Sequence, residues 1–182
     1  MNTIDKSEQF IFQTYQRQGK ALVKGEGVFL YDEDGKEYTD FLAGIAVCSL
    51  GHCHPQITEA ICKQASTLVH VSNLFYTKPQ ADLATKLCEL SFADRVFFSN
   101  SGAEANEAAI KLARRYFRKK GETKRYRIIS MLQSFHGRTM ATLSATGQDK
   151  VQEGFSPLLE GFTYVPFNDF EALKKELDDT VC

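Results

Sequence analysis

The stretch VFFSNSGAEANE, residues 96–107, decides the fold of this chain. The residues at 95–99 are mostly apolar, which predicts a short strand, and the SGAE that follows at 101–104 is the pattern of a capped helix start. We expect the helix to continue to about Lys120. A strand that passes directly into a helix is the repeating unit of α/β proteins with parallel sheets.

The same alternation continues toward the C-terminus. The expected elements are a strand at 126–132, a helix at 139–145 ended by Gly147, a strand at 162–167, and a helix at 170–177 with Asn168 as its start signal. Strands that alternate with helices favour a parallel sheet, so we predict an α/β fold for residues 71–182. The chain reaches Cys182 just after a helix that would lead into another strand, and we therefore expect this sheet to be incomplete.

Residues 1–70 are predicted to form a separate α+β segment. The expected elements are a helix at 5–17, strands at 28–31 and 36–41 on either side of Asp34-Gly35, and a helix at 56–69 that follows Pro55. An Asp-Gly pair between two short β-runs is typical of a hairpin. Proline suits the first turn of a helix because its missing N–H group has no partner there.

Composition excludes several classes of protein. The 182 residues include 22 Lys and Arg against 23 Asp and Glu, so no cationic excess favours nucleic acid or membrane binding. Hydrophobic residues make up 43% of the chain, which is typical of a folded domain. The five cysteines form no C-x-x-C pair, so neither a disulfide framework nor a zinc site is predicted. Without a long apolar segment, we expect a cytoplasmic protein and no membrane partner.

The start of the helix at 101 is the first candidate site. Its first turn presents free N–H groups, and Gly102 has no Cβ to keep a phosphate away from them. This arrangement predicts an anion site. Capping and the helix dipole also explain Ser101, Glu104 and Glu107 without any ligand, and that interpretation stays open.

The second candidate site is SFHGRT at 134–139, which again lies between a predicted strand and a helix. Phe135 can stack on a planar ligand, Gly137 permits close backbone approach, and Arg138 can bind a carboxylate with two hydrogen bonds. In the alternative interpretation, Phe135 is a core residue and Arg138 a surface charge.

Other motifs give weaker signals. No P-loop is present, and Leu30 stands where a dinucleotide motif that begins at Gly25 needs its third glycine. His52-Cys53-His54 lacks a second pair of ligands, so we expect structural histidines at a turn and no metal.

A basic stretch from Arg114 to Arg127 supports a function of a different class. It contains eight basic residues, one acid and the aromatics Tyr116, Phe117 and Tyr126, a composition that could make a nucleic-acid-binding module. At helical spacing, however, Tyr116 and Phe117 continue an apolar face. We therefore expect the aromatic rings in the core and the bases in solvent, with no nucleic acid bound.

Taken together, the motifs resemble a known family. The motifs are, in chain order, GEGVFLYD (25–32), DFLAGIAV (40–47), LGHCHP (50–55), SNLFYTKPQ (72–80), NSGAEANEAA (100–109) and SFHGRTMATLSATG (134–147). They closely resemble the class III aminotransferases, which depend on pyridoxal 5′-phosphate. The resemblance implies a fold-type I transferase, with 1–70 as the N-terminal segment and 71–182 as the first part of a mostly parallel-sheet, cofactor-binding domain.

The resemblance also implies roles for individual residues. Ser101, Gly102 and Ala103 would hold the cofactor phosphate, Phe135 would stack on its pyridine ring, and Arg138 would bind the substrate α-carboxylate. The motifs are most similar to the branch that moves the terminal amino group of N-acetylornithine to 2-oxoglutarate in arginine biosynthesis. Ornithine, succinylornithine and 4-aminobutyrate are the alternative amino donors.

The family's catalytic lysine is not found in this sequence. By the resemblance, the Schiff-base lysine is expected beyond Cys182, and none of the lysines present lies in a matching motif. We therefore assign no catalytic residue and expect these 182 residues to be inactive alone. The resemblance further implies a homodimer when the chain is complete, with small amino acids and 2-oxo acids as substrates.

Overall fold

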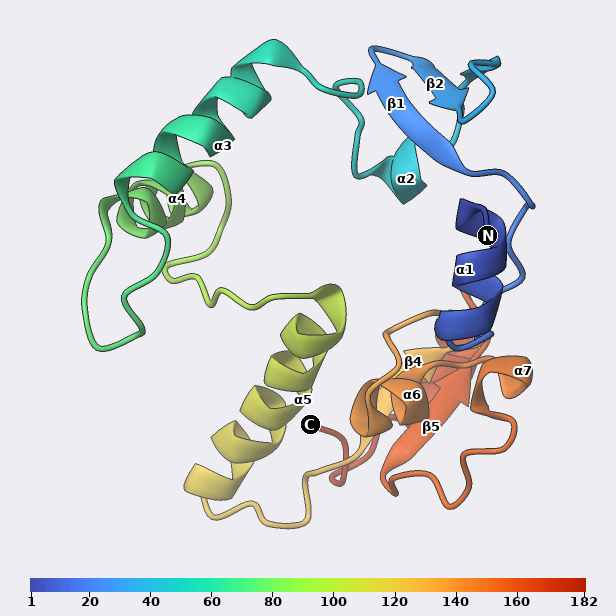
Figure 1. Cartoon of the computed structure of the whole chain (residues 1–182). Helices are drawn as coiled ribbons and strands as arrows, with labels where there is room; N and C mark the ends of the chain where they lie inside the picture. Colours follow the sequence, from blue (N-terminus) through green and yellow to red (C-terminus); the bar gives the residue numbers. More distant parts are fainter. The chain divides into compact units, whose positions relative to one another are not determined.

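The computed structural model describes residues 1–182, whose contacts gather in two compact units, Met1–Lys78 and Pro79–Cys182. Figure 1 shows the elements of both units. The first contains α1 (Thr3–Phe10), β1 (Leu22–Glu26), β2 (Phe29–Asp32), β3 (Glu37–Thr39), α2 (Ala43–Ala46) and α3 (Pro55–Thr67). The second contains α4 (Lys78–Glu89), α5 (Gly102–Lys119), β4 (Ile128–Met131), α6 (Met140–Ala145), α7 (Asp149–Gln152), β5 (Phe162–Val165) and α8 (Phe170–Glu176). No helix is both long and apolar enough to cross a membrane.

An antiparallel sheet in the order β1-β2-β3 forms the centre of the first unit. The turn between β2 and β3 lies where the Asp-Gly pair predicts it. The Asp32 carboxylate accepts the N–H groups of Asp34 and Lys36 at 3.1 and 2.9 Å, and Gly35 has a positive φ of 78°. β1 is not predicted from the sequence, because Lys24, Gly25 and Glu26 have little strand propensity and pairing with β2 supplies the order.

Helix α1 ends at Phe10, seven residues before the predicted end at residue 17. The side-chain amide of Gln13 turns back and donates to the carbonyls of Ser7, Glu8 and Ile11 at 3.3, 3.0 and 2.8 Å. Carbonyls in the last turn of a helix have no partner further along the helix, although Ser7 also accepts the N–H of Ile11 at 3.0 Å. The Gln13 side chain thus supplies hydrogen bonds that a further helical turn would have made. Hydrophobic patterning does not predict such an early end to the helix.

A half-buried hydrogen bond between two side chains joins the sheet of the first unit to the segment that follows it. Asp40 Oδ2 lies 2.7 Å from His52 Nε2, and the two side chains are 9% and 18% exposed. His52 also pairs with Gly27 through both backbone groups, at 2.7 and 3.0 Å. A Cβ on Gly25 would lie 2.8 Å from His52 Cβ, so glycine is required there. Asp40 Oδ1 accepts the N–H groups that begin the left-handed turn of α2.

The second unit is built on a parallel pair of strands, as predicted. β4 and β5 run parallel, from Ile128 opposite Phe162 to Met131 opposite Val165. Helix α6 packs on both strands and on α5, and nearly all of its residues are buried. The small core consists of Ile110, Ala141 and Ala145, with Ile128 and Phe162 against it. This core joins α5 to α6 and to both strands.

The strand predicted at 95–99 is wrong for this chain, since the segment has no regular secondary structure and pairs with no other strand. Burial still alternates along it, with Val96 and Phe98 half-buried and Phe97 73% exposed. The two-residue period is therefore present in the sequence and in the burial of the side chains. A strand also needs a neighbour for its N–H and C=O groups, and pattern alone does not supply one.

Two predicted helix ends differ in detail. Asp169 rather than Asn168 caps α8, accepting the N–H of Ala172 at 2.9 Å, while Asn168 takes a left-handed φ of 62° in the turn before it. Gly147 does not stop α6, which already ends at Ala145. Glycine is needed at 147 because a Cβ there would lie 2.4 Å from the carbonyl oxygen of Met131. Its role is close packing on β4.

The expectation of buried aromatic rings in the basic stretch is wrong for Tyr126, which is 48% exposed, and for Tyr116, which is 51% exposed. Its ring meets that of Phe117 edge-on, with centroids 5.0 Å apart. Phe117 is half-buried beneath the guanidinium of Arg125, 4.1 Å from the ring centroid. An arginine thus covers part of an aromatic face that the sequence assigns to the core.

Arg127 is the most extensively bonded side chain of the second unit. Its guanidinium donates to Thr163 and Thr180 hydroxyls, to the Glu176 carboxylate at 2.8 Å and carbonyl at 2.5 Å, and to Asp178 at 3.1 Å. Its backbone pairs with the segment around Val181 in the parallel sense. Glu176 and Asp178 raise the pKa of Arg127, so it stays charged. The residue attaches the C-terminal segment to β4.

We expect Arg127→Lys to be almost as damaging as Arg127→Ala. Lysine keeps the charge but lacks the planar fork that reaches several acceptors at once. Hydrogen bonds to charged groups contribute about 1.5–3 kcal/mol, and a loss of that size in the free energy of unfolding is expected for either variant. Thermal unfolding followed by circular dichroism measures it. Arg118→Ala, on an exposed side chain without such contacts, is the control, and an unaffected Arg127→Lys would contradict this role.

Asp40→Asn should lower the unfolding temperature by several degrees at pH 7 and have little effect near pH 3. The hydrogen bond with His52, and those from the Ala43 and Leu42 N–H groups, hold the pKa of Asp40 below its usual value. A lowered pKa stabilises the fold above the usual value, about 3.9, and this contribution disappears as the pH falls through the folded pKa. Asp34→Asn is the matched control. If Asp40→Asn lowered the unfolding temperature equally at pH 7 and pH 3, the prediction would be contradicted.

Candidate functional site

The structure brings the two predicted site motifs into direct contact. Gly137 in the loop 134–139 packs against Ala103 in the first turn of α5. A Cβ on Gly137 would lie 2.7 Å from Ala103 Cβ and 2.7 Å from the hydroxyl of Thr142, and its φ is 132°. Only glycine suits both the space and the backbone angle. The close approach predicted for Gly137 is therefore made to a neighbouring helix.

Ser101 caps α5, and its hydroxyl accepts the N–H of Glu104 at 3.2 Å. The return bond differs from the predicted capping box. Glu104 Oε2 accepts the backbone N–H of Asn100 at 2.7 Å and its side-chain amide at 3.0 Å, instead of the N–H of Ser101. The carboxylate thus fixes the residue before the cap, so the chain enters the helix in one conformation.

The first turn of α5 has room for an anion. A Cβ added to Gly102 would meet nothing within 4 Å, so open space lies beside its backbone. The N–H groups of Gly102 and Ala103 have no acceptor within the helix because they belong to its first turn. Together with the positive end of the helix dipole, they suit a phosphate group.

The loop beside this helix end presents its aromatic and basic side chains to solvent. Phe135 is 58% exposed, so the alternative interpretation of Phe135 as a core residue does not hold in this structure. Arg138 is exposed, and its guanidinium carbon lies 5.8 Å from the centroid of the Phe135 ring. No carboxylate of the protein pairs with Arg138, so its guanidinium can bind an external carboxylate.

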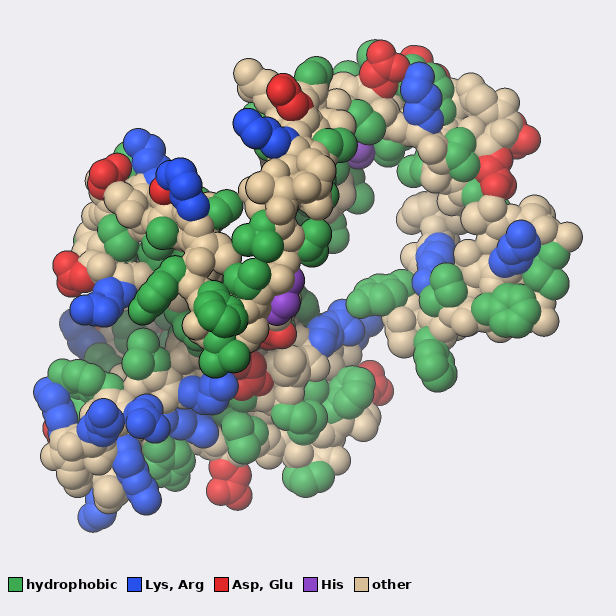
Figure 2. Space-filling model, turned by 60° about the vertical axis from the view of Figure 1, so that its left-hand side comes forward, with side chains coloured by type: hydrophobic (Ala, Val, Ile, Leu, Met, Phe, Trp, Pro, Cys, Tyr) green, Lys and Arg blue, Asp and Glu red, His purple; other side chains and the backbone are tan.

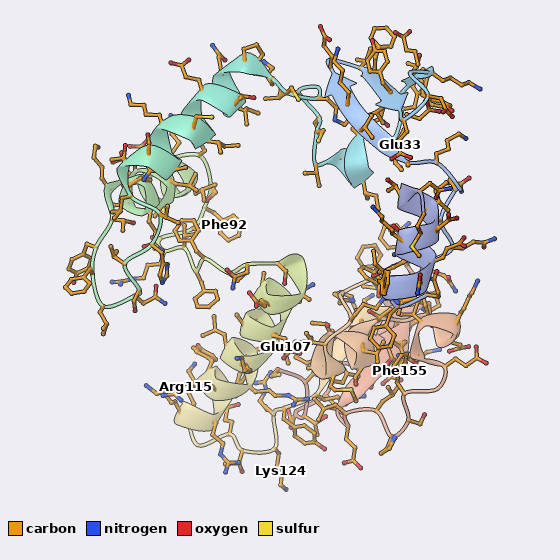
Figure 3. All side chains as sticks on the ribbon, in the orientation of Figure 1. Glu33, Phe92, Glu107, Arg115, Lys124 and Phe155 are labelled. Carbon is orange, nitrogen blue, oxygen red and sulfur yellow. The ribbon has the colours of Figure 1, made fainter.

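Two side chains of α5 that the sequence did not single out for the site bind the loop. Asn106 Nδ2 donates to the carbonyl of His136 at 2.8 Å. Glu107 Oε1 accepts the hydroxyl of Thr139 at 2.5 Å and the N–H of Ala141 at 3.2 Å. Figure 3 shows Glu107 on the side of α5 that faces α6. The spacing from Ala103 was a usable signal, since residues 103, 106 and 107 share one helix face.

Buried hydroxyls of α6 hold the loop from the other side. Thr142 and Thr146 have no exposed surface. Thr146 Oγ1 accepts the N–H of His136 at 3.0 Å, and Thr142 Oγ1 accepts the N–H of Thr139 at 3.0 Å. Both hydroxyls also donate to backbone carbonyls, so each is fully satisfied without water. Such bonds keep the loop backbone in one position while its side chains remain accessible.

The histidines at 52 and 54 occupy a turn, as expected. His52 pairs with Asp40, and His54 immediately precedes α3. No group of three or more His, Cys, Asp or Glu side chains is placed to hold a metal ion. All five cysteines are free.

The basic stretch of the nucleic-acid hypothesis divides into two parts. Arg114, Arg125 and Arg127 donate to carbonyls of the second unit, with Arg114 reaching those of Tyr126 and Glu160 at 3.0 and 3.2 Å. The remaining Lys and Arg side chains near the end of α5 are exposed and form the blue group at the lower left of Figure 2. Substitution of the three bonded arginines would therefore disturb the fold, whatever the protein binds.

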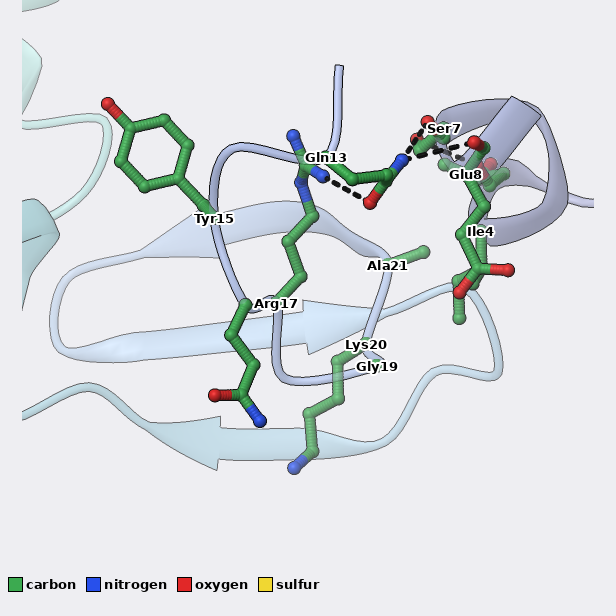
Figure 4. Close-up of a pocket in the computed structure, with 11 residues that line it drawn as sticks. Ile4, Ser7, Glu8, Gln13, Tyr15, Arg17, Gly19, Lys20 and Ala21 are labelled. Atoms are coloured by element: carbon green, nitrogen blue, oxygen red, sulfur yellow. Dashed lines mark hydrogen bonds between the residues drawn. The ribbon is translucent and has the colours of Figure 1, made fainter. Parts of the chain in front are cut away.

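A cavity of about 300 Å³ lies in the first unit, between α1 and the segment that leads to β1 (Figure 4). Tyr15, Arg17, Lys20 and Glu8 contribute to its lining. Arg17 donates to the Gln13 amide oxygen at 3.4 Å. The cavity contains none of the residues of the two motifs, and we assign it no ligand.

The sequence is similar to known enzymes over nearly its entire length. Residues 13–182 match the profile of the family described as Aminotransferase class-III. The chain is 56% identical over 179 residues to the acetylornithine aminotransferase of Caldanaerobacter subterraneus, and 57% identical over 178 residues to that of Methanocaldococcus jannaschii. These matches cover 98% of this chain but 46% and 45% of the relatives, so the chain spans about half their length.

The fold agrees with that similarity. The ornithine aminotransferase of Toxoplasma gondii, whose structure is described with partial occupancy of PLP at the active site, superposes with a TM-score of 0.88 at 31% identity. The match covers 94% of this chain and 41% of that one. The predicted fold-type I architecture is thereby confirmed. With a family profile matching residues 13–182 and a shared fold, the chain belongs to the class III aminotransferases.

Proposed function

We propose that this chain forms the part of a pyridoxal-phosphate-dependent aminotransferase that binds the cofactor phosphate, the cofactor ring and the substrate carboxylate. The observation that supports this most directly is the contact of Gly137 with Ala103, which places an open helix start beside an exposed aromatic ring and an unpaired guanidinium. Membership of the class III family supports the same reaction class.

Ser101, Gly102 and Ala103 would hold the cofactor phosphate in this proposal. The open space at Gly102 is what such a group needs, because any side chain there would occupy it. The exposed ring of Phe135 would stack on the pyridine ring. When bound, the cofactor carries the amino group between the two substrates, and the protein supplies binding and orientation.

Arg138 would bind the α-carboxylate of the amino donor. An unpaired guanidinium suits a carboxylate because two parallel N–H···O bonds fix its orientation as well as its position. The lysine that would complete the catalytic group is not assigned within this chain.

For the amino donor we propose N-acetylornithine, which would place the enzyme in arginine biosynthesis. The support is similarity to acetylornithine aminotransferases at 56% and 57% identity. Ornithine, succinylornithine and 4-aminobutyrate are the alternatives. Five free cysteines agree with a reducing compartment such as the cytoplasm. A homodimer is the assembly we propose, and large exposed apolar side chains such as Phe92 and Tyr76 support burial against further protein.

The test joins this chain to the remaining C-terminal part of the Caldanaerobacter enzyme. We expect the joined protein, loaded with pyridoxal phosphate, to form glutamate from 2-oxoglutarate and N-acetylornithine, with a higher kcat/KM than for ornithine or 4-aminobutyrate. The 182 residues alone should give no turnover. Preference for another donor would support the corresponding alternative, and a folded joined protein without aminotransfer would contradict the proposal.

In the joined protein, Arg138→Lys should lower kcat/KM for N-acetylornithine by about ten- to a hundredfold. Losing one arm of a charge-assisted pair costs roughly 1.5–3 kcal/mol, and lysine cannot restore the second hydrogen bond. Cofactor absorbance should remain, since other residues hold the phosphate and ring. Arg118→Lys serves as the control. Unchanged kinetics would remove Arg138 from the substrate site, and loss of cofactor absorbance would assign it a different role.

A further inference from the structure

One face of α5 holds the loop 134–139 at three points. Ala103 touches Gly137, Asn106 donates to the carbonyl of His136, and Glu107 accepts the hydroxyl of Thr139. Residues 103, 106 and 107 are three and four apart, so they project from the same side of the helix. These three residues of α5 therefore contact three consecutive parts of the loop, and we call this set of contacts the seam.

The loop residues of the seam lie before and after Arg138 in the chain. His136 and Gly137 precede it, Thr139 follows it, and all three are bound to α5, whereas the Arg138 side chain is exposed. Its own contact is with the face of the Phe135 ring, at 5.8 Å. The position of Arg138 therefore depends on the backbone to either side of it rather than on bonds of its guanidinium.

Glu107 fixes the far end of the loop as well. The oxygen that accepts the Thr139 hydroxyl also accepts the N–H of Ala141 at 3.2 Å, in the first turn of α6. A carboxylate is favourable there because it satisfies an N–H group that has no partner in the helix. Without Glu107, the loop would remain held by the hydroxyls of Thr142 in α6 and of Thr146, the residue that follows α6, and neither belongs to α5.

We propose that Asn106 and Glu107 are positioning residues that fix the loop 134–139 relative to the start of α5. This inference rests on the proposed function, in which the N–H groups of Gly102 and Ala103 and the ring of Phe135 act on one ligand. A phosphate and a ring on the same molecule are a fixed distance apart. The start of α5 and the loop 134–139 must be separated by a matching distance, and Asn106 and Glu107 set the separation of these two segments.

Hydrogen exchange of the ligand-free chain tests the structural half. Asn106→Asp places a carboxylate oxygen against the His136 carbonyl, and Glu107→Ala removes the acceptor of Thr139 and Ala141. Either change should speed exchange about fivefold or more in peptides covering 134–141, and leave the C-terminal half of α5 unchanged. Glu107→Gln keeps an oxygen at the same place and should restore slow exchange.

Glu171→Ala is the matched control, because this helical carboxylate contacts only the exposed Lys174. Exchange at 134–141 that does not respond to Asn106→Asp or Glu107→Ala would overturn the proposal. An equal rise throughout Pro79–Cys182 would overturn it too, since that outcome means general loss of structure.

Binding of two ligands tests the functional half. Pyridoxine 5′-phosphate has the ring and phosphate but cannot react with lysine, whereas inorganic phosphate requires only the start of α5. Asn106→Asp and Glu107→Ala should each weaken pyridoxine 5′-phosphate about five- to tenfold and leave the affinity for inorganic phosphate unchanged. When either substitution is combined with Phe135→Ala, the affinity for pyridoxine 5′-phosphate should fall no further than with Phe135→Ala alone. Equal weakening of both ligands, or additive losses, would overturn the proposal.

The outcomes for the two proposals are distinct. If the unaltered chain binds pyridoxine 5′-phosphate no more tightly than inorganic phosphate, the proposed cofactor site fails. The exchange rates at 134–141 still decide whether Asn106 and Glu107 fix the loop. If the unaltered chain prefers pyridoxine 5′-phosphate and the variants retain that preference, the positioning role fails and the cofactor site stands.

Discussion

The second unit depends on the absence of one atom, the Cβ of residue 137. With it, the loop 134–139 could not lie against Ala103, because the added carbon would be 2.7 Å from the Cβ of that residue. That contact lets α5 approach the loop closely enough for Asn106 and Glu107 to bind it. The helix start and the exposed ring of Phe135 become neighbours only as a result.

Polar groups rather than a large apolar core hold this region together. The buried core of the second unit is small, yet Thr142, Ser144 and Thr146 are almost fully buried and each is hydrogen bonded. Hydroxyls in short side chains occupy little space and can satisfy loop N–H groups directly. A loop fixed in this way keeps its functional side chains exposed without losing its position. The same principle operates at Arg127, where one guanidinium attaches the C-terminal segment.

Large apolar side chains remain exposed over both units, among them Phe41, Leu74, Tyr76, Phe92 and Phe97. The segment at 95–99 likewise has strand-like burial but no paired neighbour. Both features follow from one physical fact. Apolar faces and strand edges are stabilised only by other protein that covers them, and none of these side chains is covered within the chain.

The sequence by itself determined the α/β order of the second unit, the hairpin at Asp34-Gly35 and the start of α5. Each depends on contacts between residues close in the chain, such as a cap or a tight turn, and on the spacing of apolar residues. The family followed from several ordered motifs, although no single motif was specific.

Only the tertiary structure decided how those elements meet. Glu107 has the sequence pattern of a charge that complements the helix dipole, but in the structure it binds the start of a different helix. The segment 95–99 has a strand pattern but no partner, and Tyr116 has a core pattern but is exposed. The physical reason is the same in each case. Local sequence sets backbone preference and the direction of a side chain, whereas its partner comes from residues distant in the chain.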